Sequence, residues 1–177
     1  MAEITVRVLD EEDWQTLRQL RLAALEDAPE AFAAHYEEES QYGEEVWRKR
    51  LRRARRLLAD HDGEPAGIVS MGTHDEDSTE PELFGLWVDP RSRRERVAWQ
   101  LVQAGADQAL RDGHERLYFW VGSDNGGAVA FASIFGFRPT SERRPMRAAD
   151  DTDSEDETAM VLALTEDPRS VHNPLLP

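Results

Sequence analysis

The sequence contains no cysteine among its 177 residues. This absence excludes disulfide bonds, thiolate metal ligands and any reaction that passes through a cysteine-bound acyl group. No apolar run approaches the length of about 20 residues that a membrane-spanning helix needs. The N-terminal stretch, MAEITVRVLDEED, is too acidic for a secretion signal. We therefore expect a cytoplasmic protein that does not associate with membranes.

Basic charge is also scarce, with 21 Lys and Arg residues against 36 Asp and Glu residues and a formal net charge of −15. This balance argues against nucleic-acid binding and suits a cationic substrate such as an amine, although solubility alone is a simpler explanation. The hydrophobic content of 40% and the chain length fit one folded domain with a real core. We expect that domain over residues 1–165, followed by a loosely held tail over 166–177.

The stretch from Glu82 to Leu110 organises the rest of the chain. Residues 82–88 read as a strand that ends before Pro90, because proline has no amide hydrogen for a sheet ladder. From Val97 onward, apolar residues recur at helical spacing. A helix that starts just after a strand presents unpaired N–H groups and a positive dipole end. These features can bind a diphosphate.

Other patterns predict strands at 4–8, 57–59, 66–71 and 117–121, one after Phe137 and one at 159–164. They predict helices at 14–25, 44–56 and 125–135. The Asp62-Gly63 turn indicates a hairpin between the second and third strands. The predicted helix at 44–56 carries a basic face from Arg48 to Arg56, which we interpret as solvated, with docking of an acidic partner as the alternative. Residues 148–157 form an acidic loop.

Two motifs in this order resemble those of the GNAT (GCN5-related) N-acetyltransferase family. The first, in which R/Q-x-x-G-x-G/A follows V-x-P, is matched at Arg93 and Ala98, but Arg96 stands in place of its glycine. The second, N-x-x-A-x-x-L-Y-x-x-x-G-F, is matched by NGGAVAFASIFGF at residues 125–137, with Ala132 in place of its tyrosine. Two motifs in the expected order and context carry more weight than either alone.

The resemblance implies an α/β (α+β) fold with a central, mixed but mostly antiparallel sheet flanked by helices. It implies transfer of an acetyl group from acetyl-CoA to a primary amine of a small molecule or peptide, by direct attack in a ternary complex. The alternative is a degenerate GNAT domain that binds an acyl-CoA as a regulatory or interaction module, and the residues at positions 96 and 132 favour it. A homodimer is the common closed assembly. The sequence does not identify the acceptor.

The resemblance also implies site residues. Glu82, at the head of the central strand, is the candidate general base, and an exposed strand-end glutamate is the alternative. Because Ala132 replaces the family's tyrosine, the presumed proton donor for the departing thiolate, Tyr118 is a possible substitute, although we prefer to interpret it as a core residue. None of the histidines has a partner at metal-ligand spacing, so we predict no metal site. Expected cofactor contacts are Leu86, Trp87, Val88, Arg93, Arg94, Glu95, Arg96, Val97, Ala98 and Asn125. Candidate acceptor contacts are Phe32, Tyr36 and Phe84, and a packing role is the alternative that we prefer for each one taken singly.

Overall fold

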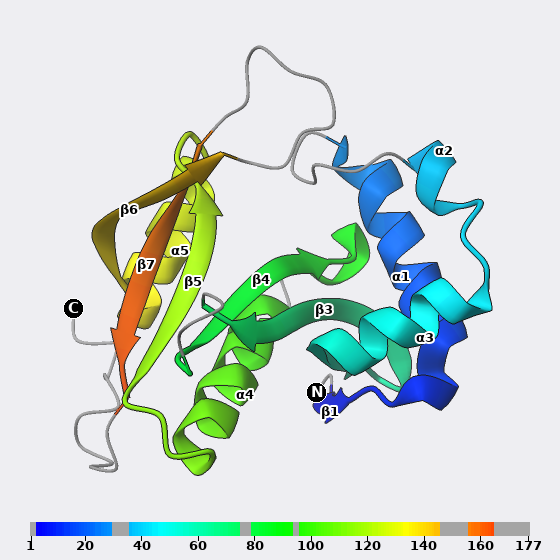
Figure 1. Cartoon of the computed structure of the whole chain (residues 1–177), viewed down its shortest axis with the longest axis horizontal. Coiled ribbons are helices and arrows are strands. Elements are labelled where there is room, and N and C mark those ends of the chain that lie inside the picture. Colours follow the sequence, from blue (N-terminus) through cyan, green and yellow to red (C-terminus); the bar gives the residue numbers. More distant parts are fainter. Residues whose placement is uncertain (1–2, 30–35, 75–78, 94–95, 146–155, 165–177) are drawn as a thin grey trace.

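A single seven-stranded sheet, in the order β1-β2-β3-β4-β5-β7-β6, runs through the molecule (Figure 1). The computed structural model describes residues 3–29, 36–74, 79–93, 96–145 and 156–164. Neighbouring strands are antiparallel except for the parallel pair β4 and β5, which confirms the predicted fold class. The strands are β1 (Ile4–Val8), β2 (Arg55–His61), β3 (Glu64–Thr73), β4 (Pro81–Val88), β5 (Arg116–Gly122), β6 (Arg138–Pro145) and β7 (Asp156–Ala163). The helices are α1 (Trp14–Asp27), α2 (Tyr36–Glu39), α3 (Glu44–Arg53), α4 (Val97–Arg111) and α5 (Gly126–Phe135).

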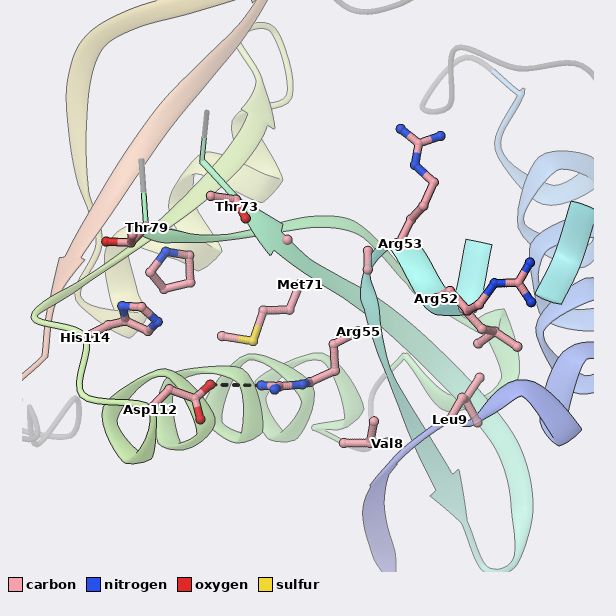
Figure 2. Close-up of a pocket in the computed structure, with 14 residues that line it drawn as sticks. Val8, Leu9, Arg52, Arg53, Arg55, Met71, Thr73, Thr79, Asp112 and His114 are labelled. Carbon is pink, nitrogen blue, oxygen red and sulfur yellow. Dashed lines mark hydrogen bonds and ion pairs between the residues drawn. The ribbon is translucent and has the colours of Figure 1, made fainter. Parts of the chain in front are cut away.

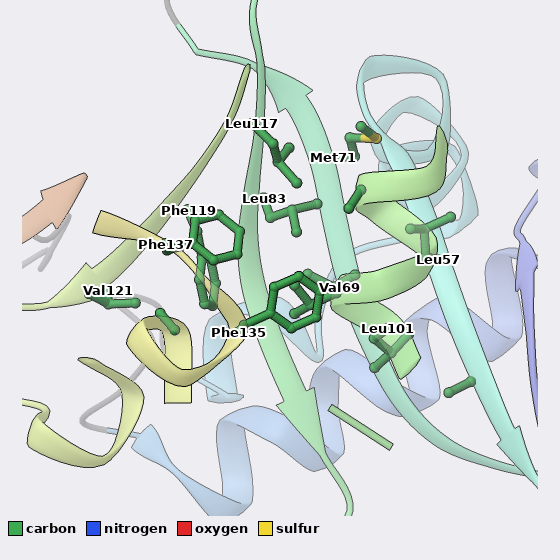
Figure 3. Close-up of a cluster of buried hydrophobic side chains, with 14 of the residues drawn as sticks. Leu57, Val69, Met71, Leu83, Leu101, Leu117, Phe119, Val121, Phe135 and Phe137 are labelled. Carbon is green, nitrogen blue, oxygen red and sulfur yellow. The ribbon is translucent and has the colours of Figure 1, made fainter. Parts of the chain in front are cut away.

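Helix α4 covers one face of the sheet, where the larger hydrophobic core lies (Figure 3). Alternate residues of the strands point to this face, and Leu83 and Leu101 are both fully buried in it. Gly67 on β3 allows the close approach of β4 and α4. A Cβ atom at this position would lie 2.9 Å from the backbone oxygen of Trp87 and 3.0 Å from Val97 Cγ1. The packing therefore fixes where α4 begins relative to the end of β4.

Helices α1 and α3 cover the opposite face of β2 and β3. Leu20 and Trp47 from these helices pack on Leu58 and Ile68 from the strands. The carboxylate of Glu39, at the end of α2, is 2% exposed and accepts hydrogen bonds from Arg21 of α1 and Arg50 of α3. Burial alone would raise the pKa of Glu39, but the two guanidinium groups outweigh it and leave that pKa below its usual value. This buried carboxylate ties the three helices together.

Strands β4 and β5 are paired only at Glu82–Tyr118 and Leu83–Phe119 and then diverge. On its other side, β4 contains a bulge, because the register with β3 passes from Ser70–Phe84 to Ile68–Trp87. Gly85 lies in this bulge with a φ of +63°, a conformation that side chains rarely adopt. Beyond Leu83, the backbone of β4 therefore has no strand partner on the side that faces β5.

The structure corrects several predicted boundaries. Helix α3 ends at Arg53, and β2 begins at Arg55, so the predicted helix at 44–56 is too long and Arg56 belongs to a strand. The basic side chains had suggested a continuous helix face, but pairing with β1 and β3 overrides that local pattern. The connection before α3 contains the one-turn helix α2, and β7 begins at Asp156, inside the predicted acidic loop. The predicted tail and residues 148–155 lie outside the described residues.

Candidate active site

The start of α4 is the segment where the sequence predicts a diphosphate cradle. The first helical hydrogen bond runs from Gln100 N–H to the backbone oxygen of Arg96, at 3.1 Å. The N–H groups of Val97, Ala98 and Trp99 therefore have no acceptor within the helix. Arg96 is the residue before the helix and has φ 64° and ψ 18°, the left-handed conformation in which glycine is the usual residue. Its side chain is exposed and points away from the hydrophobic core.

The loop between β4 and α4 is tied to the end of α1 through Asp27. One carboxylate oxygen of Asp27 accepts hydrogen bonds from the Trp87 indole, at 2.9 Å, and from the Arg93 guanidinium. The hydrogen bond from Trp87, and then the one from Arg93, lower the pKa of Asp27. Arg93 also donates to the backbone oxygen of Val88, at 3.1 Å. In this structure the Arg93 side chain thus holds the loop in place.

The other predicted contact residues lie in different settings. Asn125 caps α5 by accepting a hydrogen bond from Ala128 N–H, at 3.0 Å. The Val97 side chain is fully buried, so only its backbone can meet a cofactor. Tyr36 is 43% exposed at the start of α2. Arg94, Glu95 and Phe32 lie outside the described residues.

Glu82 is buried, at 7% exposure, so the alternative of an exposed strand-end glutamate is wrong. Its carboxylate accepts a hydrogen bond from the Trp120 indole N–H on β5, and Arg144 of β6 lies 3.8 Å away. Burial raises the pKa of Glu82 above its usual value, against the lowering effects of Trp120, Arg144 and His74. A carboxyl group with a raised pKa, next to the point where two strands diverge, is suited to proton transfer.

His74, which is not among the predicted site residues, is a close neighbour of Glu82. Its ring stacks on Tyr118, with the centroids 3.7 Å apart, and only 7% of its side chain is exposed. Nδ1 is buried and lies 3.4 Å from a Glu82 oxygen, without hydrogen-bond geometry, while Nε2 lies 2.7 Å from a Glu142 oxygen. Because Glu142 is half exposed, these groups join the buried carboxylate to the surface. No motif contains His74, since only the sheet brings it to Glu82.

Tyr118 and Ala132 bear on the proton for the departing thiolate. Tyr118 is 8% exposed beneath His74, and burial, followed by a hydrogen bond with Glu80, raises its pKa. This packing supports the core interpretation of Tyr118. Ala132 is fully buried in the cluster that contains Phe135 and Phe137, so a tyrosine in its place would have to displace neighbours. Ser133, the next residue along α5, is exposed.

A pocket of about 470 Å³ lies at the other end of α4 from the cradle (Figure 2). Its lining includes Arg55 and Asp112, which form an ion pair at 3.0 Å, together with Met71 and His114. It therefore does not coincide with the diphosphate cradle. Within the described ranges, no three His, Asp or Glu side chains converge as metal ligands would. No helix in those ranges is long and apolar enough to cross a membrane.

Residues 14–137 match the family model described as the acetyltransferase (GNAT) family. The chain belongs to the GNAT family. This result confirms the resemblance drawn from the two motifs, and it covers α1 to the start of the segment after α5. No curated protein matches the sequence.

Solved GNAT structures share the fold. An N-acetyltransferase from Staphylococcus aureus Mu50 aligns with a TM-score of 0.71 and 16% identity, covering 92% of this chain and 99% of that one. The putative acetyltransferase yncA from Salmonella typhimurium, solved with acetyl-CoA, has a TM-score of 0.67 and 20% identity, covering 92% and 95%. The paiA N-acetyltransferase from Thermoplasma acidophilum, solved with coenzyme A, has a TM-score of 0.66 and 18% identity, covering 91% and 99%.

Proposed function

We propose that this GNAT protein transfers an acetyl group from acetyl-CoA to a primary amine of a small molecule or peptide, by direct attack in a ternary complex. The observation that carries the proposal is the buried Glu82, which lies where β4 and β5 part and has its pKa raised by burial. The chain has no cysteine to hold an acetyl group between two half-reactions, which favours direct transfer.

The described residues fit an acyl-CoA. The open N–H groups of residues 97–99 suit a pyrophosphate, as helix starts do in many nucleotide sites. The backbone of Leu86, Trp87 and Val88, which has no strand partner toward β5, suits the pantetheine amides. Bound acetyl-CoA supplies the acetyl group as an activated thioester. The yncA and paiA structures, which contain acetyl-CoA and coenzyme A, support this assignment.

Glu82 acts on the acceptor. An alkylamine has a pKa of about 10 and is almost entirely protonated at neutral pH, so it must lose a proton before it can attack. The Glu82 carboxylate accepts that proton. From there, His74 and Glu142 give the proton a route to the surface over distances of 3.4 and 2.7 Å.

Substitution of Glu82 by glutamine tests this role, because it removes the base and keeps the shape. We expect turnover to fall by about 100-fold, at the low end of what a positioned base contributes, with acetyl-CoA affinity unchanged. Release of free coenzyme A with a panel of amines measures turnover, and calorimetry measures affinity. Glu64→Gln, an exposed glutamate on β3, is the control. Unchanged turnover in Glu82→Gln would remove Glu82 from the mechanism.

A non-catalytic acyl-CoA-binding domain is the second candidate, and the buried Ala132 favours it because the family's tyrosine has no counterpart there. A thiol with a pKa of about 8.5 can leave with water as its proton source, so the loss slows the reaction more than it abolishes it. Calorimetry with acetyl-CoA separates the candidates. Binding with thiol release supports the enzyme, binding without release for any amine supports the module, and no binding at millimolar acetyl-CoA rules out both.

A further inference from the structure

Arg56 is a partly buried cation on β2 without an acidic partner among the described residues. Strand alternation directs its side chain to the face covered by α1 and α3, the same face as Leu58. It donates a hydrogen bond to the hydroxyl of Ser70 and a long one, of 3.5 Å, to the backbone oxygen of Arg50. Its Nε atom is buried and has no acceptor. Each of the two terminal nitrogens of Arg56 makes one of these bonds and so keeps a second N–H for a ligand.

The charged groups around Arg56 increase its need for an acidic partner. Arg50, Arg21 and Arg53 all act on it with positive charge, and the buried carboxylate nearby, Glu39, already binds Arg50 and Arg21. Burial, and then these three arginines, lower the pKa of Arg56 to about 10. The group is still protonated at neutral pH. A buried charge that lacks a counter-ion destabilises a fold, so its presence points to a ligand of opposite charge.

Arg56 and the proposed catalytic residue, Glu82, lie on the same face of the sheet, on strands with β3 between them. Arg56, Ser70 and Phe84 are in register across β2, β3 and β4, and the guanidinium carbon is 5.6 Å from the Phe84 ring centroid. Glu82 is two residues from Phe84 on β4 and faces the same side, so Glu82 lies about 7 Å along the strand from Phe84, the residue that Arg56 contacts. A molecule of a few bonds bound over Phe84 can thus reach both Glu82 and Arg56.

We propose that Arg56 binds an anionic group of the acceptor, so that the substrate is a small amine that also carries a carboxylate or a phosphate. This inference rests on the proposed acetyltransferase function and adds the acceptor class to it. The arginine forms charge-assisted hydrogen bonds to the oxyanion while the amine meets Glu82. The net charge of −15 does not oppose this binding, because salt screens charges that lie farther away than about 8 Å. The arginines close to Arg56 make the local charge positive.

Paired acceptors test the proposal. Each ω-amino acid in a series of chain lengths is compared with its own carboxamide, which has the same amine and no negative charge. In a second arm, each aminoalkyl phosphate is compared with the carboxamide of the same chain length. We expect kcat/KM to favour the anionic member at least tenfold in the wild-type protein. The arm with the larger ratio identifies carboxylate or phosphate. A wild-type preference for the carboxamide, or a ratio near one in both arms, overturns the proposal.

Two variants link the preference to Arg56. In Arg56→Gln the ratio should fall to near one, whereas Lys49→Gln, which removes the same charge from an exposed position on α3, should keep the wild-type ratio. Arg56→Lys, which keeps the charge without the forked donors, should lie between the two, and it replaces Arg56→Gln if that variant does not fold. A ratio that is unchanged in both Arg56 variants contradicts the assignment.

A binding readout separates this proposal from the acetyltransferase function. The N-acetylated ω-amino acids and N-acetylated aminoalkyl phosphates are titrated into wild-type protein and Arg56→Gln by calorimetry. If no amine is acetylated, the acetyltransferase proposal fails, and the titrations still decide the anion site. Affinity at least tenfold weaker in Arg56→Gln supports the site, and equal affinity, or no binding to the wild type, refutes it.

Discussion

Arg96→Gly should stabilise the protein, because Arg96 holds a backbone conformation that suits glycine. Its φ of 64° lies in the left-handed region at the residue before α4. In that region the Cβ atom of an L-residue crowds the following carbonyl oxygen, at a cost of about 1–2 kcal/mol. Glycine has no Cβ and avoids this strain.

The gain is smaller than the strain, because glycine also loses more backbone freedom on folding, by about 0.5–1 kcal/mol. The net increase in the free energy of unfolding is therefore about 0.5–1 kcal/mol. For a domain of this size, 1 kcal/mol corresponds to about 2–4 °C in Tm. Acetyl-CoA should bind Arg96→Gly as tightly as the wild type or more tightly, since the exposed arginine no longer crowds the phosphate.

Urea unfolding measures the stability change as a shift in the midpoint at constant slope. Arg96→Ala is the matched control, because it removes the same charge and side chain but keeps a Cβ in the strained conformation. It should stay within about 0.5 kcal/mol of the wild type. If Arg96→Gly is no more stable than Arg96→Ala, the strain argument is refuted. A tenfold loss of acetyl-CoA affinity, or about 1.4 kcal/mol, would instead make Arg96 a phosphate ligand.

Four further outcomes are expected. Glu39→Gln should lower the free energy of unfolding by about 3 kcal/mol, since it leaves Arg21 and Arg50 facing a neutral group. Glu37→Gln, at an exposed position, should change that free energy little. Equal effects of the two substitutions would contradict the buried ion-pair cluster. Turnover should rise with pH through a pKa above 4.5, as Glu82 becomes a carboxylate, and this limb should vanish in Glu82→Gln. Because the folded-state pKa of Glu82 is raised, Glu82 contributes to stability below its usual pKa of 4.5, and this contribution is lost as pH rises through the folded-state pKa. Glu82→Gln should therefore be at least as stable as the wild type at pH 7. A less stable variant would count against the raised pKa. Gly67→Ala should lower the free energy of unfolding, measured in urea, by about 1–3 kcal/mol, because the added Cβ pushes β4 and α4 apart. Gly126→Ala, whose Cβ meets open space, should not lower it. An unchanged free energy in Gly67→Ala would show that the packing there relaxes.

Much of the fold could be predicted because its signals are local. Pro90 ends β4, and the apolar spacing after Val97 gives α4 its length. The Asp62-Gly63 turn joins β2 and β3, with both residues at positive φ. The helix start was also predicted, since it belongs to the first motif, and the family resemblance singled out Glu82 at the head of the central strand.

The neighbours of Glu82 could not be predicted, because they come from distant parts of the chain. His74 is in a loop, Trp120 is on β5 and Arg144 is on β6, and only the pairing of strands brings them together. Arg56 was misplaced for a related reason. Its helical neighbours favoured a solvated face, whereas pairing with Ser70 of β3 turned its side chain inward.

The sequence by itself determined the order of the main elements, the family and the two segments that we propose for acetyl-CoA binding, because turns, helix starts and motifs depend on residues close together in the chain. The tertiary structure decided the surroundings of the charged side chains. Burial raises the pKa of Glu82 and lowers that of Arg56, and it arises only when strands and helices far apart in sequence close around them.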